Sequence, residues 1–186
     1  MYNEGIKRKI GGLTMKRRKM IIIMFMMICL VSVGVLSSQD AVHAKKITSV
    51  SQAEKKALKK VKNAVVTEVE KDYENGKLVY EITLVKGTRE YELTYRASNG
   101  KLLSYSWEQN GQKRNSNKNR ISKSACKKLA KSKVKKASIQ SVIGEYDDGS
   151  YIYVIKMKKG SKKYTLEYDA ATGTLLEYQW KRITKK

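Results

Sequence analysis

The sequence predicts an α+β fold in which two tandem copies each pack one helix on a four-stranded antiparallel sheet. The 186-residue chain aligns with itself at a shift of 73 residues without gaps, and 24 of the 60 positions compared are identical. Each copy opens with apolar residues at helical spacing and continues with four short segments in which polar and apolar residues alternate. A helix and a sheet with one apolar face each can cover one another, which predicts the two layers.

The helix comes first in each copy. In the first copy, Ser49 or Ser51 can cap a helix whose inward face includes Ala53. In the second copy, Ser122 is the expected cap. Cys126 takes the place of Ala53 in the alignment, so we expect a small, buried and unreactive core residue, with a reactive thiol as the alternative.

Four strands follow each helix. In the first copy they are expected at residues 65–73, 77–85, 88–96 and 101–107. Glycine-containing turn signals suited to tight hairpins separate them, at residues 74–76, 86–87 and 98–100. Because one copy of about 60 residues is marginal as an independent core, we expect the two sheets to pack together or to join.

Two acidic segments of the second copy are predicted to be turns. Asp169 is expected to accept hydrogen bonds from the local backbone, with Gly173 at a positive φ, and binding of an ion or a partner is the alternative. Asp147 and Asp148 precede Gly149 and predict a hairpin. Calcium is a weaker explanation there, because it takes about six to eight oxygen ligands.

Residues 1–44 are predicted to be a signal peptide. Basic residues at 16–19 precede an uncharged apolar run at 20–36, and a small-residue cleavage site ends at Ala44. Met15 is a candidate for the true start, and an uncleaved membrane anchor is the alternative to cleavage. The remaining chain divides into a first repeat, a polar linker and a second repeat, at residues 45–107, 108–120 and 121–186.

The composition of the chain narrows its function. It has 40 Lys+Arg against 17 Asp+Glu, and its single histidine, His43, lies beside the predicted cleavage site. Without histidine in the exported chain, we expect no enzyme activity, no metal centre and no cofactor. Cys126 is the only cysteine after residue 44, and a secreted chain without disulfides suggests the exterior of a Gram-positive bacterium.

Two motifs of the second repeat resemble the PepSY domain family. Ile121 and Ser122 open the helix, and the closing strand and turn run from Tyr164 to Gly173 as Tyr-Thr-Leu-Glu-Tyr-Asp-Ala-Ala-Thr-Gly. The first repeat departs from this pattern, with Arg96 in place of the aspartate. The resemblance implies a non-catalytic binding role outside the cell or at its surface, often the inhibition or control of a peptidase.

Two sets of side chains are candidates for binding. Aromatic residues near strand ends are candidates for contact with an extracellular or envelope protein, with core packing as the alternative: Tyr105, Trp107, Tyr178 and Trp180. Lysines of the two helices are candidates for contact with polyanions, with a solvated face as the alternative: Lys55, Lys56, Lys59, Lys60, Lys127, Lys128 and Lys131. Because the chain is predicted to be exported, the polyanions expected are wall polymers or anionic lipid headgroups and not nucleic acid.

Overall fold

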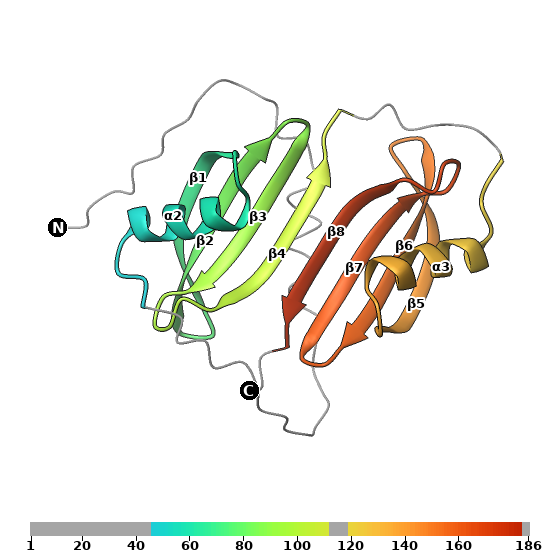
Figure 1. Cartoon of the computed structure of the whole chain (residues 1–186). Coiled ribbons are helices and arrows are strands. Elements are labelled where there is room, and N and C mark those ends of the chain that lie inside the picture. Colours follow the sequence, from blue (N-terminus) through green and yellow to red (C-terminus); the bar gives the residue numbers. More distant parts are fainter. Residues whose placement is uncertain (1–45, 112–118, 184–186) are drawn as a thin grey trace.

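The computed structural model describes residues 46–111 and 119–183 (Figure 1). In this part of the chain, two helices lie on one side of an antiparallel sheet. The helices are α2 (Val50–Lys60) and α3 (Lys123–Lys133). The strands of the first repeat are β1 (Val65–Glu74), β2 (Lys77–Lys86), β3 (Arg89–Arg96) and β4 (Leu102–Gln109). Those of the second are β5 (Ser138–Asp147), β6 (Ser150–Lys159), β7 (Lys162–Asp169) and β8 (Leu175–Arg182).

Both helices begin at serine caps, as the sequence predicts. The Gln52 N–H donates to the Ser49 side chain at 3.3 Å. The Ala125 N–H donates to Ser122 in the same way at 3.1 Å, so each cap satisfies one of the free N–H groups of the first turn. The helix residues that are fully buried are all small, which lets each helix approach the sheet closely: Ala53, Ala57, Cys126 and Ala130.

The sheet corrects the predicted fold in one detail. The strand order is β1-β2-β3-β4-β8-β7-β6-β5, so the two copies share a single eight-stranded sheet in place of two four-stranded ones. The expectation that the copies pack or join is met by the pairing of β4 with β8. Two separate sheets would leave the main-chain groups along β4 and β8 unpaired, and joining the sheets removes both of these edges.

The two repeats meet around an approximate two-fold axis. Ser106 of β4 pairs with Gln179 of β8, which is its equivalent at the 73-residue shift. On either side of this pair, a tyrosine of one repeat lies opposite a tryptophan of the other: Tyr105 opposite Trp180, and Trp107 opposite Tyr178. Each contact therefore occurs twice with the repeats exchanged, as in the interface of a symmetric dimer.

One ion pair breaks this symmetry. Lys181 of β8 lies 3.0 Å from the carboxylate of Glu74, at the end of β1, and so links the second repeat to the first. The equivalent positions in the opposite halves hold Glu108 and Asp147, which carry like charges. The backbone pairing of β4 with β8 is therefore symmetric, whereas the charges at this equivalent pair of positions differ: one pair has opposite charges and the other has like charges.

The turns have the conformations that their residues favour. Asp148 and Gly149 have φ of 44° and 77°, which fits the two-residue hairpin predicted there. In the closing turn, one carboxylate oxygen of Asp169 accepts the N–H groups of Ala171 and Thr172, both at 2.8 Å, and Gly173 has a φ of 73°. Both turn predictions are confirmed.

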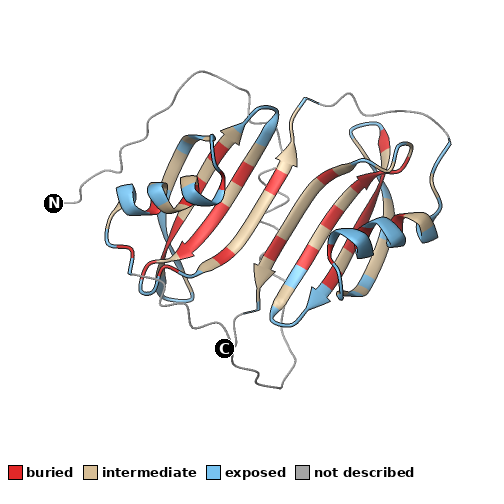
Figure 2. Cartoon of the chain, viewed as in Figure 1, coloured by how far each residue is buried: buried red, intermediate tan, exposed pale blue. Residues whose placement is uncertain are grey.

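The core is continuous across the joint between the repeats. Each helix packs with the sheet residues of its own repeat to form a cluster, and buried positions alternate along the inner strands (Figure 2). Four partly buried residues of the joint pack against both clusters: Leu102, Tyr105, Leu175 and Tyr178. Because they belong to both cores, neither repeat can lose its packing without exposing apolar surface of the other.

Two of the predicted segments lie wholly or partly outside the described residues. The signal peptide at 1–44 falls wholly outside them, and so do residues 112–118 of the polar linker predicted at 108–120. Strand β4 extends to Gln109, two residues into that linker. Within residues 46–111 and 119–183, no helix has the length and hydropathy needed to cross a bilayer.

Candidate partner-binding site

The joint between the repeats carries a cluster of four aromatic side chains, which we call the aromatic seam: Tyr105 and Trp107 of β4, and Tyr178 and Trp180 of β8. Directly paired residues of antiparallel strands point to the same face of a sheet, so all four share one face. It is the face that carries the helices, because Trp107 packs in the same cluster as Ala53. Helix α2 contacts β1 and β2 while α3 contacts β5 and β6, so both helices lie to the sides of the seam (Figure 1).

The rings of the seam contact one another across the joint. The Trp107 and Tyr178 rings are stacked, with centroids 6.5 Å apart and planes at 17°. Tyr105 and Tyr178 meet edge to face, with centroids 6.3 Å apart. Tyr91 and Tyr164 extend the cluster outward on β3 and β7, with centroids 6.2 Å from Tyr105 and Tyr178, respectively. These are the separations at which aromatic pairs attract beyond simple burial.

The four candidates differ in how far they reach the surface. Trp107 and Trp180 lie near the ends of β4 and β8 but are only 7% and 8% exposed, so their indoles pack into the core, which is the alternative given from the sequence. Tyr105 and Tyr178 remain partly exposed. Burial raises the pKa of both tyrosines, that of Tyr178 to about 12, so both hydroxyls stay protonated at neutral pH and can donate hydrogen bonds.

Basic side chains border the aromatic seam. The guanidinium of Arg89 lies 4.2 Å from the centroid of Trp107, and the ammonium of Lys162 lies 3.8 Å from that of Trp180. Lys133, at the end of α3, lies 5.7 Å from the ring of Tyr178. Cations over ring faces are attracted by the ring quadrupole. Burial lowers the pKa of the Lys162 ammonium, and nearby cations led by Arg182 lower it further.

Arg89 and Lys162 were not among the sequence candidates. The two residues are equivalents at the 73-residue shift, and both stand two positions before a tyrosine of the cluster. The sequence feature that could have identified them is a basic residue at the same position in both copies. It could not be interpreted without knowing that β3 and β7 lie beside the joined strands.

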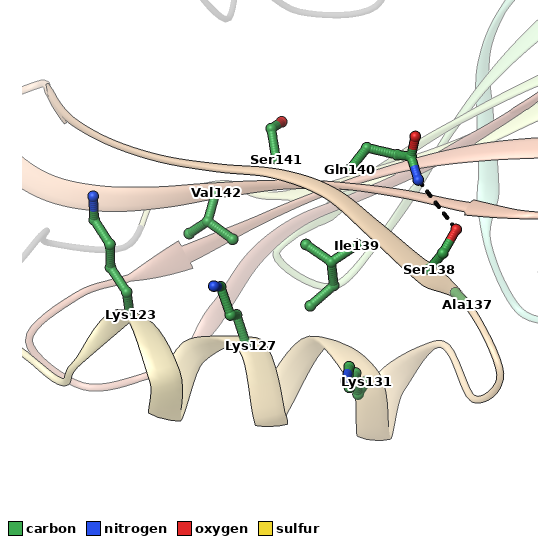
Figure 3. Close-up of a pocket in the computed structure, with 9 residues that line it drawn as sticks. All are labelled: Lys123, Lys127, Lys131, Ala137, Ser138, Ile139, Gln140, Ser141 and Val142. Atoms are coloured by element: carbon green, nitrogen blue, oxygen red, sulfur yellow. Dashed lines mark hydrogen bonds between the residues drawn. The ribbon is translucent and has the colours of Figure 1, made fainter.

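The lysine candidates do not form one patch. On α2, Lys55, Lys59 and Lys60 are exposed, while Lys56 is half-buried with its ammonium 5.6 Å from the ring centroid of Tyr95. On α3, the three candidates Lys127, Lys128 and Lys131 are exposed. Two of these, Lys127 and Lys131, line a groove between α3 and β5 (Figure 3). Lys123, which was not a sequence candidate, lines the same groove. The signal for Lys123 was its i, i+4, i+8 spacing with the other two.

The remaining candidates for chemistry have structural roles. The thiol of Cys126 is fully buried, and burial raises its pKa to about 11, so the predicted core residue is confirmed. In the described ranges, no group of three or more His, Cys, Asp and Glu residues is placed to hold a metal ion.

The opposite face of the first repeat is acidic. Glu81 of β2 lies directly across from Glu70 of β1, with Asp72, Glu74 and Glu92 nearby. Burial raises the pKa of the Glu81 carboxyl to about 7, and the neighbouring carboxylates, of which Glu92 is the strongest, raise it further in the same direction. The helix-bearing face, where cations border the aromatic seam, and its reverse in the first repeat therefore differ in charge.

Comparisons with known proteins point to one family. Residues 48–105 and 120–179 each match PepSY, described as the peptidase propeptide and YPEB domain. Among solved structures, the fold is similar to that of a Clostridium difficile 630 protein described as a lipoprotein, with 17% identity, a TM-score of 0.34, and coverage of 77% of this chain and 100% of that one. It is also similar to the Bacillus megaterium YpeB C-terminal domain, with 13% identity, a TM-score of 0.41, and coverage of 72% and 63%. No curated protein sequence matches the chain.

Proposed function

This chain belongs to the PepSY family in both of its repeats, and from that premise we propose that it acts outside the cell, or at its surface, as a non-catalytic module that binds and regulates a peptidase or another envelope protein. The family description, peptidase propeptide, supports a partner of the peptidase class. The aromatic seam is the surface through which we expect the partner to bind.

The observation that carries this proposal is the partly exposed aromatic face that lies between the two helices in the described part of the chain. Tyrosine and arginine are enriched at protein–protein interfaces, because each combines a large contact area with a polar group that fixes orientation. The seam supplies Tyr105 and Tyr178 as partly exposed hydroxyl-bearing rings, with Arg89 and Lys162 at its border. The buried indoles hold these rings in place, so the surface is formed before the partner arrives.

The test is capture of a partner from the surface of the producing cell. The tagged full chain is crosslinked, washed in high salt and analysed by mass spectrometry, and the captured protein is then assayed for peptidase activity with and without the chain. A variant with Tyr105→Phe and Tyr178→Phe keeps the rings and removes the hydroxyls, and a variant with R89Q and K162Q removes the bordering cations. Both are expected to weaken capture by about tenfold or more, since hydrogen bonds and ion pairs at an interface centre are worth about 1–3 kcal/mol.

The matched control neutralises two lysines away from the seam, K55Q and K59Q, and is expected to leave capture unchanged. Loss of capture by the control alone would refute the seam as the contact surface. If no protein survives the high-salt wash for the unmodified chain, the regulatory role itself is refuted.

A second function is favoured by the exposed lysines of α2. Lys55, Lys59 and Lys60 lie on a solvent-facing side of a chain with a formal net charge of +23. In this alternative the chain is held to anionic wall polymers or lipid headgroups without a specific protein partner. Reversing the three charges to glutamate should then release the chain from cells, and the wild-type chain should be released by salt, because exposed charges are screened beyond about 8 Å at physiological ionic strength. Retention of the reversed variant would exclude this alternative.

A further inference from the structure

A groove runs between α3 and the edge strand β5, and we call it the lysine groove (Figure 3). It is open to solvent and has a volume of about 670 Å³. One wall is formed by Lys123, Lys127 and Lys131 of α3, and the other wall and the floor by residues 137–142. All three lysines are exposed, and the side chains of Lys123 and Lys127 rise from the helix toward β5 (Figure 3).

The spacing of the lysines matches an extended peptide. Residues four apart on a helix rise by about 6 Å, because each residue adds about 1.5 Å. Alternate residues of an extended strand are about 6.8 Å apart and point to the same face. Three acidic side chains at alternate positions of such a segment can therefore each meet one lysine of the row.

The opposite wall can accept an extended segment as well. Within the described residues, β5 is the last strand of the sheet and pairs with β6 alone. The other side of β5 therefore presents main-chain N–H and C=O groups of the kind that bind added strands. Ser138, Gln140 and Ser141 are among the lining residues, and the half-buried side chains of Ile139 and Val142 point from β5 toward α3, while those of Gln140 and Ser141 point away from the helix (Figure 3). The bulge at Gln140 interrupts the register, so the main-chain contacts are expected on either side of it.

The first repeat provides an internal comparison. At the positions equivalent to the three lysines it has Val50, Glu54 and Leu58, and at the position of Ser141 it has Glu68. Both helices nevertheless have the same length, cap and small buried residues. The fold therefore does not require the lysine row, and the positive groove is a property of the second repeat alone.

We propose that the lysine groove binds an extended acidic segment of the partner protein, with carboxylates at alternate positions facing Lys123, Lys127 and Lys131. This inference rests on the binding role proposed above and states the chemistry of the partner. The aromatic seam and the lysine groove are separate contacts, since α3 stands between them on the helix-bearing face.

The first experiment measures peptide binding to the full chain. The probe is a fluorescein-labelled octapeptide in which glutamate alternates with threonine, and its matched control is the isomer with the four glutamates contiguous. Both have the same charge, so a difference between them reports spacing. At physiological salt the alternating peptide is expected to bind at least about fivefold more tightly, because only it can place one carboxylate against each lysine at once.

The second experiment compares two variants with the same change of charge. K123Q/K127Q/K131Q removes the row, and K55Q/K59Q/K60Q removes three exposed lysines of α2. Exposed ion pairs contribute up to about fivefold in affinity each, so the groove variant should lose about ten- to a hundredfold and the control less than about threefold. Thermal unfolding checks that both variants keep their fold.

Three results would overturn the inference: equal binding of the two isomers, equal loss in the two variants, or no binding of the alternating peptide. Equal binding of the isomers together with competition by inorganic polyphosphate would show a polyanion surface instead. Failure of the groove proposal can be distinguished from failure of the proposed regulatory function. If K123Q/K127Q/K131Q still captures the envelope partner from cells, the groove proposal fails and the regulatory role stands. If the groove binds the alternating peptide and no protein is captured from cells, the preference of the groove for an extended acidic segment stands and the regulatory role fails.

Discussion

The seam tyrosines should contribute more to stability than any exposed tyrosine of the chain, and Tyr178→Ala tests this most directly. Tyr178 packs against the cores of both repeats and contacts the rings of Trp107, Tyr105 and Tyr164. Truncating a half-buried tyrosine exposes on the order of 100 Å² of apolar surface, which costs about 2.5 kcal/mol at about 25 cal/mol per Å². The lost aromatic contacts add about 0.5 kcal/mol each, so the free energy of unfolding should fall by about 4 kcal/mol.

The assay is equilibrium unfolding in urea, followed by circular dichroism and by tryptophan fluorescence. Because the two cores share residues of the joint, both probes should report one transition for the wild-type chain. The control is Tyr73→Ala, at a hairpin position where the side chain is 68% exposed, and it should cost less than about 0.5 kcal/mol. A loss below about 1 kcal/mol in Tyr178→Ala, or two separate wild-type transitions, would refute a shared core.

Three further predictions concern single side chains. Because the folded Glu81 carboxyl has a pKa of about 7, above its unfolded value of 4.5, its contribution to stability falls as pH rises through this window. Glu81→Gln should therefore stabilise the chain at pH 8 by about 1 kcal/mol after allowing for solvent screening, with no gain at pH 4, and an equal gain at both pH values would contradict the assignment. Asp169→Ala leaves two N–H groups of its turn without their acceptor and should lower the free energy of unfolding by about 1–3 kcal/mol, measured in urea, whereas a neutral effect would show that the turn needs only Gly173. In a chain with Cys29→Ser, the buried thiol of Cys126 should react with Ellman's reagent only as the chain unfolds, and rapid labelling of this native chain at pH 8 would disprove its burial.

Local structure could be predicted from the sequence because short-range chemistry determines it. The serine caps at 49 and 122, the paired left-handed residues at Asp148 and Gly149, and the carboxylate of Asp169 each act within four residues of themselves. The repeat supplied a second copy of the cap and hairpin signals, so the elements of one half supported those of the other, whereas Asp169 has Arg96 as its equivalent. Each strand of the first repeat lies within two residues of its predicted bounds.

The joint could not be predicted in the same way. Alternation in β4 shows that one face is apolar, and this pattern is the same whether the strand is at an edge or is paired on both sides. The sequence therefore left both contact with a partner and core packing open for Trp107 and Trp180 near their strand ends, and the structure buries both opposite tyrosines of the other repeat. The lysine row was only partly identified from the sequence. Lys123 lines a groove only because β5 lies opposite α3, and β5 begins fifteen residues further along the chain.

The two-fold pairing of β4 with β8 has a consequence for the origin of the chain. A surface that contacts its own equivalent around a two-fold axis is what two identical single-repeat chains would use to form a homodimer. Expressed alone, the second repeat would expose β8, and Gln179 could then pair with Gln179 of another molecule in the register that Ser106 now occupies. Gene duplication would have converted that encounter into an intramolecular one, at the millimolar effective concentration that a short connection provides. Once the halves were covalently joined, each could change independently, which explains how one repeat could acquire a row of lysines while the other kept valine, glutamate and leucine at the same positions.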